Sequence, residues 1–187
     1  MEIQQKNLAG LSRKELAAEL ADMDEKPFRV KQLWHWIYNQ GETKFDKMTN
    51  LSKAFRSALA ERYEVRRPEV ADVQTSTDRT KKWLIRFDDK QEAETVYIPE
   101  KDRGAICISS QVGCTLTCTF CRTGTQRLVR NLTAPEIVGQ FMLARDFYGE
   151  WPTPTDGERL ISNIVMMGMG EPLLNYQNVK KALKIIM

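Results

Sequence analysis

Three cysteines within a span of eight residues constrain the fold of this chain more than any other feature. Cys114, Cys118 and Cys121 have a C-x3-C-x2-C spacing, which we expect to gather three sulfur atoms around one point. Such a point is typical of a metal or iron–sulfur site. Iron–sulfur clusters normally take four cysteine thiolates, and no cysteine follows Cys121 to supply the fourth. One iron would therefore be open to a ligand that is not protein.

A structural zinc site is the main alternative. Zinc prefers four closed protein ligands, usually in C-x2-C pairs or in such a pair combined with histidines. The only histidine, His35, lies far upstream, whereas Cys107 is available to complete a set of four thiolates. The cysteine spacing alone leaves this alternative open.

A disulfide framework fits the sequence less well. The chain begins without a basic-then-apolar signal segment, and it has no apolar run of the length that a membrane span needs. We therefore expect a cytoplasmic protein that does not contact a membrane and whose thiols stay reduced. The net charge of +3 is compatible with a phosphate-binding surface and equally with an ordinary solvated exterior.

The first third of the chain is predicted to be a small helical domain covering residues 1–66. Ser12 and Glu15 form a capping-box pattern that opens a helix running to about residue 22. A second helix is expected between Pro27 and Gly41, and a third over about residues 50–63, because both segments repeat apolar residues at helical spacing.

The hydrophobic period then changes to two, which predicts strands. Residues 67–103 are expected to form an antiparallel β segment with strands at 70–74, 82–87 and 94–98. Residues 104–187 are predicted to start an α/β core. In it, a strand at 105–109 leads through the cysteine loop to a helix that begins at the capping box of Thr133 and Glu136.

A second strand–helix unit follows this core helix. The apolar run 161–167 is typical of a buried parallel strand, and a helix is expected from about Tyr176. Two parallel strands do not make a stable covered sheet, and the last helix ends on apolar residues without a cap. We therefore expect further strand–helix units beyond residue 187 and interpret the core as an incomplete (β/α) barrel.

With its three cysteines in the loop after the first core strand, the chain resembles the radical S-adenosylmethionine (SAM) enzymes. The resemblance includes the aromatic Phe120 before the last cysteine. It implies that Cys114, Cys118 and Cys121 bind a [4Fe-4S] cluster whose vacant iron chelates SAM, and that Phe120 packs near the adenine of SAM. By itself Phe120 is equally consistent with a core aromatic.

The run Gly168-Met-Gly-Glu-Pro172 follows the next predicted strand. Glycine allows a ligand to approach the backbone closely, and a carboxylate accepts hydrogen bonds from an ammonium group. Alone, this pattern is more often a turn that ends a strand. Placed one unit after the cysteine loop, it resembles the segment that holds the amino group of SAM in these enzymes, which assigns Gly170 and Glu171 to SAM.

Three longer segments resemble the RlmN family over essentially the whole chain: 94–100, 107–114 and 165–174. Enzymes of this family methylate carbon 2 of adenosine in 23S rRNA and in tRNA. The resemblance implies that one SAM methylates a cysteine of the enzyme and that a second SAM, cleaved at the cluster, activates that methyl group. It further implies an electron donor such as flavodoxin, the two RNAs as partners, and a monomer.

The same resemblance assigns roles to two further residues. By position Glu94 is the proton acceptor, and Cys107 is the thiol that forms a transient disulfide bond with the methyl-carrying cysteine. Both roles are chemically reasonable, because a placed carboxylate serves as a base and thiol exchange needs a free cysteine. Without the resemblance, Glu94 reads as a surface charge and Cys107 as a small buried residue.

The chain departs from the family pattern in one respect, because the family carries its methylated cysteine in the C-terminal half. This chain has no cysteine beyond Cys121, so we expect it to be an N-terminal portion that does not turn over alone. Two other functions stay open. One is a relative that methylates carbon 8 of adenosine, and the other is a non-catalytic, zinc-stabilised RNA-binding fragment.

Local basic clusters give modest further support for contact with nucleic acid. They are typical of phosphate binding, although solvated surface charge is the commoner explanation for any one residue. The clusters lie beside the cysteines and on one predicted hairpin: Arg122, Arg127 and Arg130, and Arg79, Lys81 and Lys82.

Overall fold

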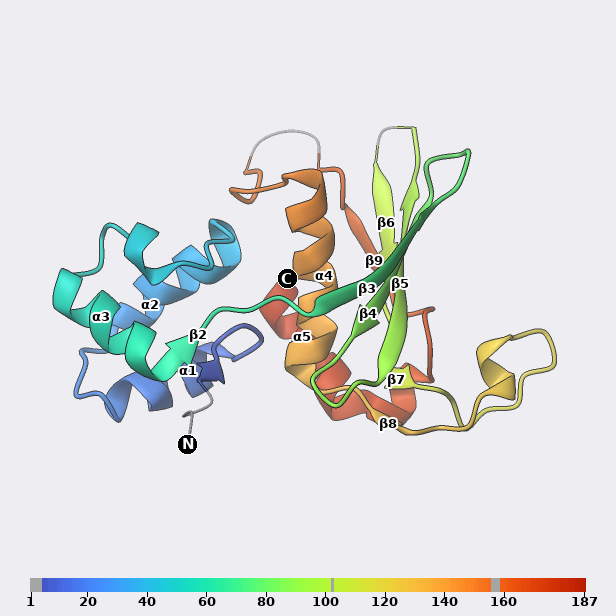
Figure 1. Cartoon of the computed structure of the whole chain (residues 1–187), viewed down its shortest axis with the longest axis horizontal. Coiled ribbons are helices and arrows are strands. Elements are labelled where there is room, and N and C mark those ends of the chain that lie inside the picture. The colour runs from blue at the N-terminus through green and yellow to red at the C-terminus, as the bar shows by residue number, and fades with distance from the viewer. Residues whose placement is uncertain (1–4, 102, 156–158) are drawn as a thin grey trace.

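The computed structural model describes residues 5–101, 103–155 and 159–187. A group of helices at the N-terminal end and a β-sheet lie on opposite sides of two long helices, α4 and α5 (Figure 1). A long loop that carries the cysteines extends away from the foot of the sheet. Among the residues described, no helix has the length and apolar character that crossing a membrane requires.

The N-terminal helices form where their sequence patterns predict. Helix α1 (Arg13–Ala21) has the predicted capping box, in which the Ser12 side chain accepts from the Glu15 backbone N–H and Glu15 reaches back to Ser12. Helix α2 (Phe28–Trp34) continues as the π-helical turn η1 (His35–Asn39) and ends before Gly41, whose φ of +67° is the left-handed value expected of a helix-ending glycine.

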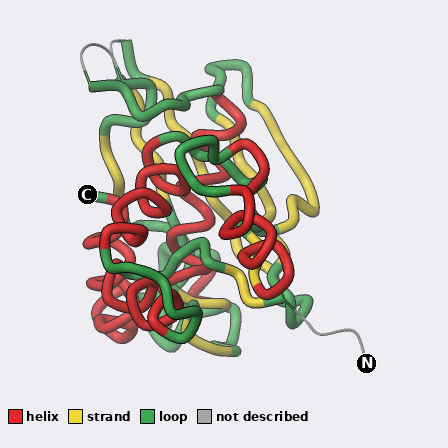
Figure 2. The backbone as a smooth tube through the Cα atoms, turned by 90° about the vertical axis from the view of Figure 1, so that its left-hand side faces the viewer, coloured by secondary structure: helices red, strands yellow, loops and turns green. Residues whose placement is uncertain are grey.

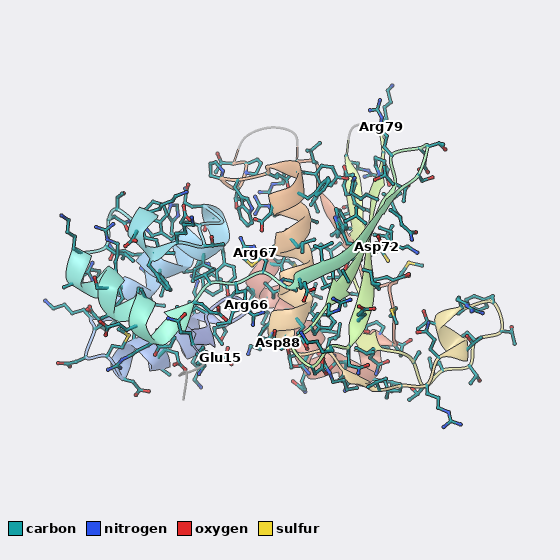
Figure 3. All side chains as sticks on the ribbon, viewed as in Figure 1. Glu15, Arg66, Arg67, Asp72, Arg79 and Asp88 are labelled. Carbon is teal, nitrogen blue, oxygen red and sulfur yellow. The ribbon has the colours of Figure 1, made fainter. Side chains whose placement is uncertain are left out.

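The remaining N-terminal elements are short. The 3-10 turn η2 (Phe45–Lys47) precedes helix α3 (Lys53–Arg62), which Ser52 caps. Strand β1 (Lys6–Asn7) pairs in parallel with β2 (Tyr63–Glu64) and so joins the two ends of this region. Arg66 and Arg67, which follow β2, lie at the link between the helices and the sheet (Figure 3).

The main sheet has five strands in the order β3-β4-β5-β6-β9. The predicted antiparallel meander is confirmed in β3 (Glu69–Thr75), β4 (Lys81–Arg86) and β5 (Glu92–Pro99). Strand β6 (Gly104–Cys107) pairs antiparallel with β5 and parallel with β9 (Asn163–Val165). The meander and the two core strands therefore share one continuous sheet.

Helices α4 (Ala134–Tyr148) and α5 (Tyr176–Ile186) cover one face of this sheet (Figure 2). The buried Trp83 of β4 packs edge-on against Phe147 and Tyr148 of α4. Helix α4 opens with the predicted capping box of Thr133 and Glu136 and ends at Gly149 in the left-handed conformation. A short turn, η4 (Pro172–Asn175), leads into α5.

Strand β9 departs from its prediction as a buried strand. It is shorter than the apolar run 161–167, its first residue Asn163 is exposed, and Met167 just beyond it is 81% exposed. The physical reason is its place at the edge of the sheet, where β6 is its only partner among the described strands. An edge strand loses the burial that a neighbour on its second side would give.

Candidate cofactor and catalytic site

The cysteine loop begins and ends on a small two-stranded ladder. Strand β7 (Gln111–Val112) pairs antiparallel with β8 (Arg130–Asn131), and this pairing holds the two ends of the loop 113–129 together. Gly113, with a φ of +73°, makes the turn into the loop, and a Cβ built there would lie 2.1 Å from the Arg127 carbonyl oxygen. Only glycine permits this close approach of two backbone segments.

The three cysteines do not meet in the structure. Cys114 is half-buried at the base of the loop, Cys118 is exposed and Cys121 is half-buried, and all are free thiols. Among the described residues, no group of three or more His, Cys, Asp or Glu side chains is close enough to hold a metal ion. The expectation that the spacing gathers the sulfur atoms is therefore not met here. The loop has almost no buried side chains beyond its base, so packing within the loop does not hold the three sulfur atoms together.

The donor set nevertheless fits an iron–sulfur cluster in its chemistry. Three free thiols lie in one loop, and the Cys114 sulfur already accepts a hydrogen bond from the Leu116 backbone N–H (3.4 Å). Such contacts stabilise thiolate ligands. The Cys121 N–H donates to the Cys118 carbonyl (3.0 Å), inside a turn that includes the 3-10 segment η3 (Thr123–Thr125). A cluster would thus be held by Cys114, Cys118 and Cys121.

Phe120, which lies in this loop, is 92% exposed. Its interpretation as a core aromatic is wrong, because its ring contacts no core. Its assignment to the adenine of SAM stays a prediction, and an exposed ring is free to pack on a ligand.

The second loop of the site, residues 168–171, is held to the end of β6 by hydrogen bonds. The buried Ser109 hydroxyl accepts from the Met169 N–H (2.8 Å) and donates to the Glu94 carbonyl (2.6 Å). The Met169 carbonyl in turn accepts from the backbone N–H groups of Ser110 (2.8 Å) and Gln111 (3.1 Å). The loop is thereby fixed before any ligand binds.

Gly168 and Gly170 allow this loop to lie directly on the segment after β6. A Cβ at Gly168 would come within 2.7 Å of the Ile108 backbone, and one at Gly170 within 2.4 Å of Gln111. Gly170 also has a φ of +93°, outside the range of ordinary side chains. The glycines are therefore needed for packing within the protein, in addition to any approach of a ligand.

Glu171 is partly engaged by its own surroundings. Its carboxylate accepts from the Leu173 N–H at the start of η4 (3.1 Å), and its backbone N–H donates to Gln111 Oε1 (2.9 Å). The Gln111 amide is oriented by a second bond, from Nε2 to Asn131 (2.7 Å). The carboxylate is therefore oriented at the strand end and keeps acceptor capacity for an ammonium group.

The sheet register places Glu94 and Cys107 on the same face. Glu94 and Val96 are alternate residues of β5, and Val96 is paired directly with Cys107 of β6. Alternate residues and directly paired residues of a ladder share a face. Thr95, between them, points the other way and donates to Gln140 of α4 (2.8 Å). Glu94 and Cys107 therefore occupy the face that α4 and α5 leave open.

Their immediate environments differ. Glu94 is half-exposed and forms an ion pair with Lys82 of β4 (3.0 Å). Cys107 is 9% exposed, and its burial raises the pKa of the thiol, an effect that a hydrogen bond from the Met167 backbone opposes. The thiol is therefore protonated at neutral pH, and the predicted role in disulfide exchange would require its deprotonation.

The chain is similar to several known proteins. Residues 6–65 match the family model described as the ribosomal RNA large subunit methyltransferase N-terminal domain. Curated relatives named dual-specificity RNA methyltransferase RlmN include those of Paramagnetospirillum magneticum, 68% identical over 183 residues, and Rhodospirillum rubrum, 68% identical over 181 residues. Each alignment covers 97% of this chain.

This chain belongs to the RlmN family. It spans 40% and 42% of the length of the two relatives named above. A solved structure, described as a radical SAM methyltransferase from Sphaerobacter thermophilus, has a TM-score of 0.83 and 38% identity. That match covers 97% of this chain and 52% of the other. The mixed α/β fold is thus shared with a structure from this class of enzyme.

Among the residues that the structure describes, some in the basic clusters of this RlmN-family chain form ion pairs with carboxylates, and others do not. Arg130 is held by Asp89 (2.5 Å) and Glu136 (2.8 Å), and Lys82 is paired with Glu94. These two charges are therefore partly compensated within the protein, and their contact with phosphate stays a prediction. Arg122 and Arg127 are exposed on the cysteine loop, and Arg79 is exposed near the tip of the β3–β4 hairpin (Figure 3).

The sequence argument missed Ser109 and Gln111, and it named Lys82 only as a member of a basic cluster. Ser109 and Gln111 orient the 168–171 loop, and Lys82 pairs with the proposed base. A signal for the first two was present, because a run of three polar residues, 109–111, directly follows an apolar strand. Polar side chains that are buried at such a place need partners, and these partners proved to be the site loops.

Proposed function

We propose that the chain is the N-terminal portion of a radical SAM methyltransferase that adds a methyl group to carbon 2 of adenosine in 23S rRNA and tRNA. Its core is then the start of a (β/α) barrel, preceded by a helical accessory domain at 1–66 and the antiparallel segment 67–103. The observation that carries the proposal is that the proposed reactive residues and the two ligand loops lie together at one end of β5, β6 and β9. The two proposed reactive residues share the open sheet face, and both ligand loops leave from its edge.

Each proposed site residue of the chain has a separate role. Cys114, Cys118 and Cys121 would hold a [4Fe-4S] cluster, and the chemistry that the cluster would supply is the one-electron reduction of SAM. Gly170 and Glu171 bind the SAM amino group, and Phe120 packs near the adenine. Glu94, whose carboxylate Lys82 orients, accepts the proton from the adenine ring. Cys107 supplies the thiol that attacks the sulfur of a cysteine outside this chain. The S–S bond forms as the bond from that sulfur to the transferred carbon breaks, and this carbon takes up a proton to become the methyl group.

This function implies a set of partners and a compartment. Thiolate ligands and thiol exchange require reducing conditions, which supports the cytoplasm. The electron must come from a donor protein such as flavodoxin, and we propose that the enzyme acts as a monomer on its two RNAs.

Reconstitution of the chain with iron and sulfide without oxygen tests the cluster assignment. We expect a brown protein with about four iron and four sulfide per chain, by the stoichiometry of the cluster type. Cys118→Ala should lose the cluster, whereas Cys107→Ala, which removes the fourth thiol of the chain, should retain full iron. Zinc without acid-labile sulfide would favour the zinc-stabilised fragment and contradict the proposal.

A chimera tests the reaction. The chain is joined to the part of the Paramagnetospirillum magneticum relative that lies beyond the aligned residues, then incubated with RNA and SAM under reducing conditions. Mass spectrometry of the nucleosides should detect 2-methyladenosine, and Glu94→Ala should abolish it while iron content is unchanged. Formation of 8-methyladenosine would support the carbon-8 alternative instead.

A further inference from the structure

A cavity of about 880 Å³ lies between the N-terminal helices and the outer surfaces of α4 and α5. Its walls include Arg13 and Lys14 at the start of α1, Phe141 of α4, and Lys180 and Lys184 of α5. Because α4 and α5 separate this cavity from the sheet (Figure 1), it is distinct from the site on the open sheet face. We call it the basic groove.

The basic groove has a strong excess of positive charge. Of the lining residues that the structure describes, seven are Lys or Arg and one, Glu150, is acidic. Glu150 does not offset that excess toward a ligand, because its carboxylate is buried and paired with the buried Arg145 (3.4 Å). The groove therefore presents a positive potential to the solvent.

Most of this charge is available to a ligand. Lys181 is engaged by Glu15 (2.5 Å). Arg13, Lys14, Lys180 and Lys184 are exposed, and none of the four has an ion pair with any described carboxylate. Two of them lie against aromatic rings: Arg13 is 4.8 Å from the centroid of the Trp34 ring and Lys180 is 5.4 Å from that of Tyr176. Such stacking leaves the outward hydrogen-bond donors free.

The arrangement of the four charges suits a linear polyanion. Lys180 and Lys184 are one turn apart on α5, a rise of about 6 Å, and Arg13 and Lys14 line the same cavity from the start of α1. Lysine binds phosphate as a point charge and makes no demand on sequence. A concave groove with charge on two walls matches a strand of phosphates better than a flat surface such as a membrane.

We infer that the basic groove binds the phosphodiester backbone of the RNA substrate, away from the reacting base. The inference rests on the proposed function, which supplies RNA as the polyanion. A backbone contact of this kind fixes the position of the RNA without reading its sequence, while recognition of the base is left to the open sheet face.

The salt dependence of RNA binding tests this inference on the 187-residue chain. The probe is a fluorescein-labelled RNA hairpin, and its dissociation constant is measured by anisotropy between about 50 and 200 mM salt, concentrations at which such contacts are resolved. In the triple variant Lys14→Gln, Lys180→Gln and Lys184→Gln we expect affinity at low salt to fall at least about tenfold. The slope of log K against log salt should fall by about 3, one for each phosphate contact.

A second triple variant is the matched control. Lys44, Lys47 and Lys53 are exposed on the N-terminal helical region and do not line the groove, so their change to Gln alters net charge equally. The control should keep the wild-type slope. An equal loss in both variants, an unchanged groove variant, or no binding of the hairpin by the wild-type chain would each overturn the inference. None of these outcomes bears on iron and sulfide content, so failure here is distinguishable from failure of the proposed function.

Discussion

At the scale of single residues, the hydroxyl group of Ser109 joins the two halves of the site. It donates to the backbone of the strand that carries Glu94 and accepts from the loop that carries Gly170 and Glu171. A buried hydroxyl that serves as donor and acceptor at once fixes both partners, and neither can move without breaking a bond. The relative position of proposed base and cofactor loop thus depends on this side chain.

Replacement of Ser109 by Ala tests this coupling. The change leaves the Met169 N–H without its acceptor, which should lower the free energy of unfolding by about 1–3 kcal/mol. Urea unfolding measures the loss, and the Met169 amide should exchange its hydrogen faster. Ser110→Ala is the control, since its hydroxyl makes only a 3.4 Å contact with the Met169 carbonyl and its removal should cost less. An equal loss of unfolding free energy in the two variants would contradict the proposed coupling through Ser109.

Gly170 and Gly149 form a matched pair of glycines with positive φ. At Gly149, where φ is +62°, a Cβ would have nothing within 4 Å, so Gly149→Ala should cost about 1 kcal/mol from backbone conformation alone. Gly170→Ala adds a clash with Gln111 at 2.4 Å and should cost about 1–3 kcal/mol more. Chemical unfolding of both variants measures the difference. Similar values would mean that the 168–171 loop is not packed as described.

At the scale of elements, local chemistry predicted some features well. The capping boxes at Ser12 and Thr133 and the helix-ending Gly41 are confirmed, because each depends on residues within one turn of the helix. The burial of β9 was not predictable in this way, because it depends on which strands lie beside it. The shared face of Glu94 and Cys107 likewise follows from the register between β5 and β6, which a strand pattern alone does not give.

The contact between α1 and α5 predicts a pH dependence of stability. Burial alone would raise the pKa of Glu15, but hydrogen bonds from Lys181 and Ser12 outweigh it and lower the pKa to about 2. A carboxyl whose pKa is lower in the folded state stabilises the fold above its ordinary pKa of 4.5, and this stability is lost as the pH falls toward about 2. Urea unfolding between about pH 7 and pH 3 should therefore show a decline to which Glu15 contributes.

Glu15→Gln isolates this contribution. At neutral pH the variant should lose up to about 1 kcal/mol of unfolding free energy, a small value because both partners are partly exposed to solvent. The difference from wild type should shrink as the pH approaches about 2. Glu19→Gln is a suitable comparison, because Glu19 pairs with Lys6 within the N-terminal region and does not contact α5. A Glu15→Gln difference that stays constant with pH would contradict the ion-pair explanation.

At the scale of the whole molecule, one surface is unusually apolar. The outer side of η4 and α5 forms a groove of about 460 Å³ lined by Leu173, Tyr176 and Met187 among others, and Leu173 is 75% exposed. Strand β9 has one free edge in the described sheet. Contiguous apolar surface of this kind marks a place where further structure packs. It agrees with the expectation that more strand–helix units adjoin this end of the core.

A dye-binding measurement tests whether this surface is open in the chain. The dye ANS, which fluoresces on exposed apolar surface, should bind the native protein. The double variant Leu173→Glu and Tyr176→Glu should lose most of this fluorescence. Its free energy of unfolding should change little, because the two side chains are 75% and 50% exposed. Phe120→Ser removes an isolated exposed ring and should leave the dye signal nearly intact. In the chimera, whose added segment is expected to cover the groove, the signal should fall without any substitution. A chimera as fluorescent as the chain would mean that the added units pack elsewhere.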